Sequence, residues 1–312
     1  MGVDLFFVLS GFLITGILAK EFNRSGDIHL RNFYVRRLLR LLPCLILTCV
    51  LYVGLNMLGG NPWPISHVLV ALSYTANWVI AFDWMDLKGL SHCWSLAIEE
   101  QYYLIWPWVI IALERLNRNH LVKGLCLVIL AIALALYRSA LVQVWPVQRL
   151  HFGLDTHMDG LVLGSALFYL ASSMARMKPT KAHFRLLSFL FAPMSAFVIA
   201  VIVMTITWQS PWMGRAGYTL VAIASAVLIL DVVMSPSCLY RKILEAPFMQ
   251  YTGRISYGLY LLHYPLFLAI DQAGIFTDDV VGALFKIGIS FAAASLSFHW
   301  FESYFLRLKH RF

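Results

Sequence analysis

Long apolar stretches recur from one end of the chain to the other and are separated by short polar segments. Most of them approach the ~20 residues that a helix needs to cross the hydrocarbon core of a bilayer. They lack the period-two alternation of apolar and polar positions that marks the strands of a membrane barrel. The pattern predicts an all-α, polytopic helix bundle with spans near residues 2–19, 38–58, 93–113, 121–141, 158–174, 186–207, 216–234, 255–272 and 280–304.

The composition agrees with a chain that has lipid as its solvent. The 312 residues are 60% hydrophobic and 13% charged, and the mean hydropathy is +0.74. Soluble domains are nearer half apolar and a quarter charged. The five cysteines form no Cys-x-x-Cys pair, which gives no support for a zinc site or a disulfide framework. We expect one membrane domain over residues 1–312, without a soluble domain or a metal.

The basic residues predict the orientation, because Lys and Arg gather in the cytoplasmic loops of membrane proteins. All but five of the 24 Lys and Arg residues fall into groups within 20–40, 115–123, 176–185, 241–254 and 307–311. These groups face one side only if the apolar segment 65–82 does not cross. We therefore expect 65–82 to be re-entrant or interfacial on the outer face. The carboxyl terminus is then cytoplasmic, and a further helix before Met1 is expected.

Ionisable side chains inside spans are costly in a bilayer and are the first candidates for function. Within 93–113, helical spacing places Ser95 and Glu99 on one stripe, with His92 just before it and Glu100 beside it. Carboxylates next to a histidine could form an acid/base site or bind the hydroxyls of a substrate. An interhelical hydrogen-bond clamp is the alternative.

A second histidine lies within the span 255–272. Ser256, Tyr260 and His263 share one face of this helix. A neutral imidazole could take a proton from a hydroxyl nucleophile without burying a charge. A packing histidine is the alternative.

Two further spans carry acidic residues. In 280–304, the stripe of Ser295, His299 and Glu302 favours structural pairing. In 158–174, Asp159 lies just inside the span, next to glycines at 160 and 164 that allow close contact between helices.

Arg36, Arg37 and Arg40 begin the second span. They could be anchors that extend their charged ends to the interface. Alternatively, their planar guanidinium groups could hold the phosphates of a cytosolic, nucleotide-type donor. Glycine-rich phosphate loops, Gly-x-Ser-x-Gly elbows and His-x-x-Glu-His zinc motifs are absent from the sequence.

At these residues the chain resembles the bacterial integral-membrane acyltransferase family three. The similar strings are GVDLFFVLSGFLIT (2–15), FYVRRLLRLLP (33–43), SHCWSLAIEEQYYLIWP (91–107), DTHMDGLVLGSAL (155–167), ISYGLYLLHYPL (255–266) and FHWFESYFLRLKHRF (298–312). They follow the family order over essentially the whole chain. Members acylate hydroxyls of lipopolysaccharide, peptidoglycan, Nod factors and macrolides.

The resemblance implies transfer of an acyl group, expected to be acetyl, to a hydroxyl of a cell-surface carbohydrate or related glycan. The donor would be a cytosolic acyl-CoA, with no bound cofactor. Arg37 and Arg40 match the family's Arg-x-x-Arg motif on the donor side, and Asp4 and Ser10 belong to its helix-two signature. The family places its catalytic histidine in the helix expected before Met1. His263 and Glu99 are the catalytic candidates within this sequence.

Two other functions are compatible with the same residues. A different membrane acyltransferase that uses an intramembrane histidine could employ His263. A transporter or flippase of lipid-linked sugars could bind its cargo with the same carboxylates, but the sequence lacks the paired Gly/Pro-broken helices that favour a transporter. The net charge of +8 follows the expected topology, so we expect no nucleic-acid partner. The expected partners are the bilayer of the bacterial cytoplasmic membrane, the donor and a glycan acceptor.

Overall fold

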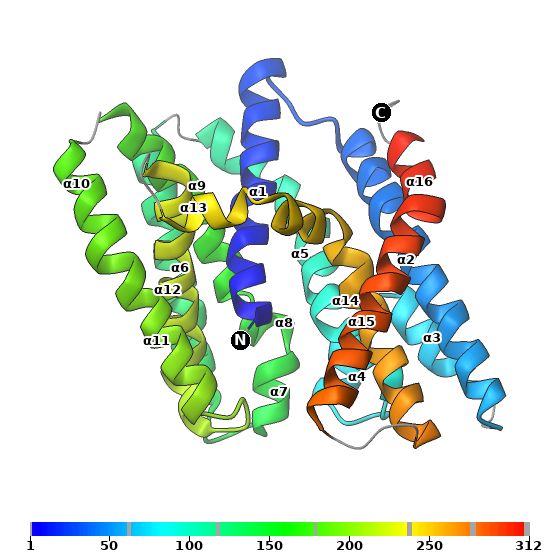
Figure 1. The fold of residues 1–312 in the computed structure, drawn as a ribbon. Coiled ribbons are helices and arrows are strands. Elements are labelled where there is room, and N and C mark those ends of the chain that lie inside the picture. The colour runs from blue at the N-terminus through cyan, green and yellow to red at the C-terminus, as the bar shows by residue number, and fades with distance from the viewer. Residues whose placement is uncertain are drawn as a thin grey trace. The chain divides into compact units, whose positions relative to one another are not determined.

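A computed structural model describes residues 2–60, 64–116, 119–177, 180–235, 239–274 and 279–308 of the chain. Every regular element in these ranges is a helix, which confirms the predicted all-α class (Figure 1). The chain forms two compact units, one made of Met1–Ile28 with Ile98–Leu244 and the other of His29–Ala97 with Glu245–Phe312. We call these unit 1 and unit 2.

Unit 1 is organised around helix α9. Its elements are α1 (Gly2–Ser25), the part of α5 (Cys93–Leu116) from Ile98 onward, α6 (His120–Leu141), α7 (Val147–Phe152), α8 (Leu154–His157), α9 (Asp159–Arg176), α10 (Lys181–Leu186), the π-helical turn η2 (Leu187–Phe191), α11 (Ala192–Thr205), the π-helical turn η3 (Met213–Gly217), α12 (Tyr218–Met234) and α13 (Leu239–Leu244). Helix α9 packs against α1, α6 and α12, so its side chains can bind partners on all three.

Unit 2 is organised around helix α14. Its elements are α2 (Leu30–Leu58), α3 (Ile65–Leu72), α4 (Ala76–Ala81), the 3₁₀ turn η1 (Lys88–Leu90), the first residues of α5, α14 (Pro247–Ala273), α15 (Val280–Leu296), the π-helical turn η4 (Ser297–Glu302) and α16 (Ser303–Leu308). Helix α14 packs against both α2 and α15.

Six helices in the described residues are long and apolar enough to cross a membrane: Gly2–Ser25, Leu30–Leu58, His120–Leu141, Ala182–Thr205, Met213–Met234 and Val280–Leu308. Each overlaps a predicted span, although the helix Leu30–Leu58 begins before the predicted start near residue 38. The other three predicted spans correspond to α5, α9 and α14, which are helices of 24, 18 and 27 residues. Their lengths are sufficient, so it is their polar content that separates them from the six. The total of nine spans stays a prediction.

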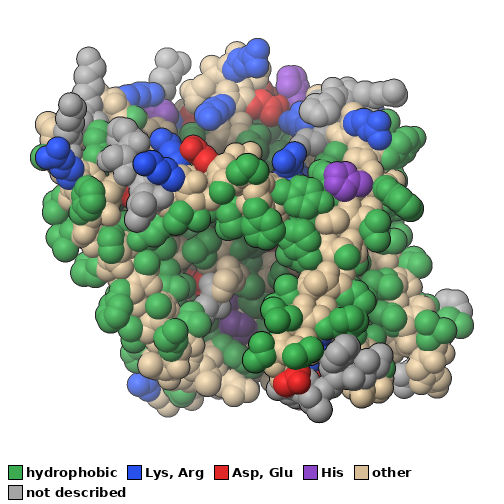
Figure 2. All heavy atoms as spheres, viewed as in Figure 1, with side chains coloured by type: hydrophobic (Ala, Val, Ile, Leu, Met, Phe, Trp, Pro, Cys, Tyr) green, Lys and Arg blue, Asp and Glu red, His purple; other side chains and the backbone are tan. Residues whose placement is uncertain are grey.

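The helices carry large apolar side chains on their outer faces. Leu58, Phe189 and Met204 are exposed by 88%, 74% and 85%, and Figure 2 shows hydrophobic side chains along the helices of the face in view. Soluble monomers seldom leave extensive apolar patches in contact with water. The exposed surface is therefore that of a protein surrounded by lipid.

The segment 65–82 contains no helix long enough to cross a bilayer. It folds as α3, of 8 residues, and α4, of 6 residues, and Tyr74 in the break between them has a positive φ of 53°. At 1.5 Å of rise per residue, neither helix approaches the roughly 30 Å of a hydrocarbon core. This break agrees with the expectation that 65–82 is not a span.

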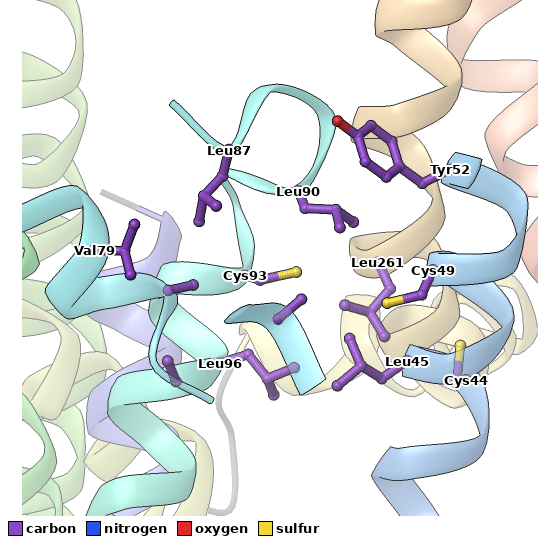
Figure 3. Packing of buried hydrophobic residues seen from close by; sticks show 13 residues of the cluster. Cys44, Leu45, Cys49, Tyr52, Val79, Leu87, Leu90, Cys93, Leu96 and Leu261 are labelled. Atoms are coloured by element: carbon purple, nitrogen blue, oxygen red, sulfur yellow. The ribbon is translucent and has the colours of Figure 1, made fainter. Parts of the chain in front are cut away.

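Instead, this segment helps to form the core of unit 2. Buried residues from α2, α3, α4, η1 and the loop before it, α5 and α14 pack together, among them Leu45, Val79, Leu90 and Leu261 (Figure 3). Three of the residues in this cluster are the unbridged cysteines Cys44, Cys49 and Cys93. These three cysteines pack as small apolar side chains.

Helices α1 and α9 approach each other through backbone contacts. A Cβ atom added at Gly11 would lie 1.9 Å from the carbonyl oxygen of Leu161, and one added at Gly164 would lie 1.9 Å from that of Val8. Ser165 Oγ, on the same face, donates a hydrogen bond of 3.1 Å to the carbonyl oxygen of Gly11. The close contact expected at position 164 is confirmed.

This contact predicts that Gly164→Ala destabilises unit 1. The new methyl group meets backbone atoms, which cannot rotate away, so we expect a loss of about 1–3 kcal/mol. The measurement is the thermal unfolding midpoint of the purified protein in detergent. Gly54→Ala is the matched control, because a Cβ at Gly54 in α2 meets nothing within 4 Å. Equal midpoints for the two variants would contradict the packing described above.

Candidate functional site

The geometry around His263 begins with a proline in helix α14. Pro265 has no amide hydrogen, so the carbonyl oxygen of Leu261, four residues earlier, loses its helical hydrogen bond. His92 Nε2 lies 3.1 Å from that oxygen. Because a carbonyl can only accept, Nε2 carries the proton and Nδ1 of a neutral His92 does not. His92 therefore satisfies the carbonyl that Pro265 exposes.

Tyr260 joins Ser95 to the same group. Its hydroxyl donates to the carbonyl oxygen of His92 over 2.6 Å, and Ser95 Oγ lies 2.5 Å from the Tyr260 oxygen. Since the Tyr260 proton is used, Ser95 is the donor in the second bond. The structure thus brings together three of the predicted residues, His92, Ser95 and His263, with Tyr260 between them.

His263 differs from His92 in which nitrogen is available. Its Nδ1 lies 2.6 Å from the carbonyl oxygen of Tyr260, so Nδ1 carries the proton. In the part of the chain that the structure describes, Nε2 of His263 has no recorded hydrogen bond. The half-buried ring stands edge-on to His92 at 5.5 Å between ring centres. A neutral imidazole held in this way presents one basic nitrogen.

Glu99 belongs to a separate cluster within unit 1. The hydroxyls of Ser10 on α1 and Tyr103 on α5 both donate to its Oε1 atom. These two donors are the partners that an interhelical clamp requires, and they join α1 to α5. The predicted stripe is therefore divided, because His92 and Ser95 bind α14 whereas Glu99 binds α1. The adjacent Glu100 is half-buried.

Asp4, also in α1, forms a buried pair with His157. His157 Nε2 lies 2.9 Å from Asp4 Oδ1, and its Nδ1 lies 2.6 Å from the carbonyl oxygen of His151. Nδ1 must donate to the carbonyl oxygen, so it carries one proton. The contact between Nε2 and Asp4 Oδ1 needs a second proton, on one atom or the other, and the His157–Asp4 pair then has no net charge. Neutrality makes its burial tolerable. The sequence analysis did not predict His157 as a partner of Asp4. The signal that could have indicated such a partner is an acidic residue inside a span with no cation one helical turn away on the same helix.

The neighbouring His151 is an uncharged hydrogen-bond donor. Burial lowers its pKa well below the usual value, with the nearby His157 adding to the effect. Its Nδ1 lies 2.7 Å from the Tyr218 hydroxyl, which itself donates to the carbonyl oxygen of Trp208. His151 Nδ1 therefore donates to Tyr218, and the residue serves packing within unit 1.

Asp159 is bound by Arg138, whose side chain is fully buried. Arg138 Nη1 donates to Asp159 Oδ1 over 2.7 Å, and Thr219 Oγ1 donates to Oδ2 over 3.0 Å. Arg138 also donates to the carbonyl oxygens of Gly214 and Thr156, both at 2.9 Å. This ion pair joins α6, α9 and α12, which gives Asp159 a structural role.

The stripe predicted near the carboxyl terminus is wrong in its register. Ser297–Glu302 is a π-helical turn, which adds a residue to the turn. Ser297, five positions before Glu302, therefore donates to its Oε1 atom over 2.6 Å, whereas His299 is exposed and lies 3.3 Å from the Tyr251 hydroxyl. Glu302 is structurally paired as expected, but its partner is Ser297 and not Ser295 or His299.

Arg37 and Arg40 lie within α2, after its first turns, and are three residues apart, so that their side chains are neighbours on the helix surface. Arg37 is half-buried and Arg40 is exposed. Their arrangement is compatible with a fork for phosphate groups and with interfacial anchoring.

Comparison with known proteins gives a consistent result. A family model described as an acyltransferase domain matches residues 1–299. A protein of Staphylococcus aureus strain COL, provisionally named an O-acetyltransferase, is 29% identical over 320 residues, which cover 98% of this chain and 52% of the relative. The O-acetyltransferase OatA of Staphylococcus aureus strain NCTC 8325 is 31% identical over 283 residues, which cover 87% of this chain and 46% of OatA. The chain spans about half the length of these curated relatives. No solved structure matches it.

Proposed function

We propose that this chain, which belongs to the acyltransferase family whose model it matches over residues 1–299, transfers an acetyl group to a hydroxyl of a cell-surface carbohydrate or related glycan. The relatives named as O-acetyltransferases support acetyl as the group transferred. The six long apolar helices support an enzyme that works within the membrane. The proposed donor is a cytosolic acyl-CoA.

His263 is the general base that the geometry favours within the described residues, and its available Nε2 is the observation that carries this assignment. In the proposed reaction, the acceptor oxygen attacks the thioester carbonyl carbon and its proton passes to the base. The carbon–sulfur bond then breaks, and the base returns the proton to the departing sulfur, so that coenzyme A leaves as the free thiol. Glu99 and Asp159 are less suited to this task, because their carboxylates are bound within the protein. His92 is less suited because its unprotonated Nδ1 is buried, whereas the ring of His263 is half-buried.

The experiment that tests this function measures acetyl transfer from acetyl-CoA by membranes that contain the full-length protein. We expect His263→Gln to lower the transfer rate by ~10²–10⁴-fold, because glutamine can accept a hydrogen bond but cannot carry the proton. His299→Gln is the matched control, since His299 is exposed in the same unit. A His263→Gln protein that folds and retains the wild-type rate would exclude this residue as the base. Absence of thioester turnover by the wild-type membranes would exclude the acyltransferase function itself.

Arg37 and Arg40 are proposed to bind the donor phosphates. Lysine keeps the charge but loses the planar fork, so Arg37→Lys with Arg40→Lys should raise the Michaelis constant for acetyl-CoA about tenfold or more. The turnover number should change less. Arg31→Lys is the control, because Arg31 lies on the same helix but outside the motif. An unchanged Michaelis constant in the folded double variant would leave both arginines as interfacial anchors.

The proposed topology has nine spans, a cytoplasmic carboxyl terminus and the segment 65–82 on the outer side. Two observations in unit 1 support it. Arg115 lies 3.5 Å from Asp27, and one pocket is lined by residues from the end of α1, the start of α6 and the end of α9. Three of the predicted cytoplasmic groups therefore lie at the same end of this unit.

Single cysteines introduced into a cysteine-free background test this topology. In intact cells, an impermeant thiol reagent should label a cysteine at Asp83, but not one at Ser25 or Arg185. The loop residue Arg118 has the same predicted side as Ser25 but lies outside the described residues. Labelling of a cysteine at Ser25 from outside would reverse the proposed orientation. If a cysteine at Asp83 is labelled only after the cells are permeabilised, the segment 65–82 does not lie on the outer side.

A further inference from the structure

A pocket of about 510 Å³ lies at one end of unit 1, where α1 and α9 end and α6 begins. Lys20 and Arg24 line it from α1, one helical turn apart, and Arg176 lines it from the last turn of α9. His120, the first residue of α6, and the ring of Phe168 complete the main part of the wall. This pocket contains none of the catalytic or donor-binding candidates described above.

The charges on the wall are of one sign. None of the described residues that line the pocket is acidic. Among the described residues, no ion pair is recorded for Lys20, Arg24 or Arg176. Arg176 Nη2 lies 3.2 Å from His120 Nε2, a neutral partner that holds the guanidinium group but leaves its charge uncompensated. Three cations thus converge on one cavity.

The preference for cytoplasmic cations and the helix dipole explain only part of this arrangement. Cations are favoured at the carboxyl ends of α1 and α9, where each helix contributes a charge of roughly −0.5. Three full positive charges exceed the sum of those two partial charges, so the cavity keeps a positive potential. The preference of basic residues for the cytoplasmic side also does not require them to line one concave surface. A cleft lined by one sign of charge concentrates ions of the opposite sign.

We propose that this pocket binds a phosphate group carried by a small anionic ligand. Arginine guanidinium groups match phosphate oxygens in pairs, and lysine adds a point charge. The volume lies in the range of small-molecule sites, roughly 300–1,000 Å³, so that the ligand extends beyond its phosphate. Phe168 offers that remainder an apolar surface. Basic pockets between membrane helices receive lipid headgroups in the same way, and a soluble phosphate ester carries the same chemistry.

The test is a binding measurement that does not depend on acyl transfer. The full-length protein is purified in a neutral detergent without phosphate, and its thermal unfolding midpoint is followed by tryptophan fluorescence. One arm compares sodium phosphate with sodium chloride at equal ionic strength. The other arm compares mixed micelles that contain phosphatidylglycerol with micelles that contain phosphatidylcholine.

We expect a phosphate-bearing probe to raise the midpoint above its matched control. A shift with sodium phosphate identifies a soluble ligand, whereas a shift confined to phosphatidylglycerol identifies a lipid headgroup. Because ligand stabilisation depends on concentration over Kd, Lys20→Gln with Arg24→Gln should require about tenfold more probe for the same shift. Arg185→Gln, which removes an exposed arginine outside the pocket, should need no more than the wild type.

Two results would overturn the proposal. One is the absence of any shift beyond the chloride and phosphatidylcholine controls. The other is an equal loss of response in the Arg185→Gln variant, which would mean that only the general charge of the protein matters. If the double variant does not fold, Arg176→Gln is judged by the same criterion, because it removes the cation that α9 contributes to the pocket.

Discussion

Inside a bilayer a polar side chain has no water to bind, and this constraint determines how the helices of each unit are joined. Fully buried Arg138 on α6 binds Asp159 on α9 and Thr219 on α12, which connects these three helices. Buried Lys123 donates to Glu114, and the Tyr169 hydroxyl donates to the same carboxylate over 2.7 Å. Removing one member of such a pair leaves an uncompensated charge, which costs about 3–5 kcal/mol. These polar residues therefore hold helices together, and this structural role has to be considered before a catalytic one.

The same constraint helps to separate structural from functional groups. His92 and His263 are adjacent and both are imidazoles, but their hydrogen bonds differ. His92 donates from Nε2 to the carbonyl that Pro265 leaves open, and its other nitrogen, Nδ1, is buried. His263 binds a carbonyl of its own helix through Nδ1, and its half-buried ring keeps Nε2 available. A general base needs an atom that the fold has not already used and that a substrate can reach. By this criterion His263 is the better acid/base candidate and Glu99, held by two hydroxyls, is the better clamp.

The basic residues divide in a comparable way. Arg115 lies near Asp27, and Arg185 is exposed, as expected for residues that report topology. Lys20, Arg24 and Arg176 instead share a cavity whose described lining residues include no acidic side chain. Arg37 and Arg40 are neighbours on the surface of α2. The charge of the side chain is the same in every case, so the surrounding surface decides whether it anchors the chain or can bind an anion.

The sequence by itself determined the helical class, the position of every long helix and the family. Apolar runs of sufficient length have one stable form in lipid, and local composition is enough to recognise them. It also indicated that 65–82 does not cross, from the distribution of basic residues along the chain, and that a small residue at 164 permits close contact, from the local sequence. Only the tertiary structure decided which polar groups meet. Asp4 finds His157 153 residues away and His92 finds the carbonyl of Leu261 169 residues away, while a π-helical turn moves Glu302 to Ser297. Such pairs depend on helix packing and on small changes in helical pitch, which a one-dimensional pattern of polar and apolar residues does not contain.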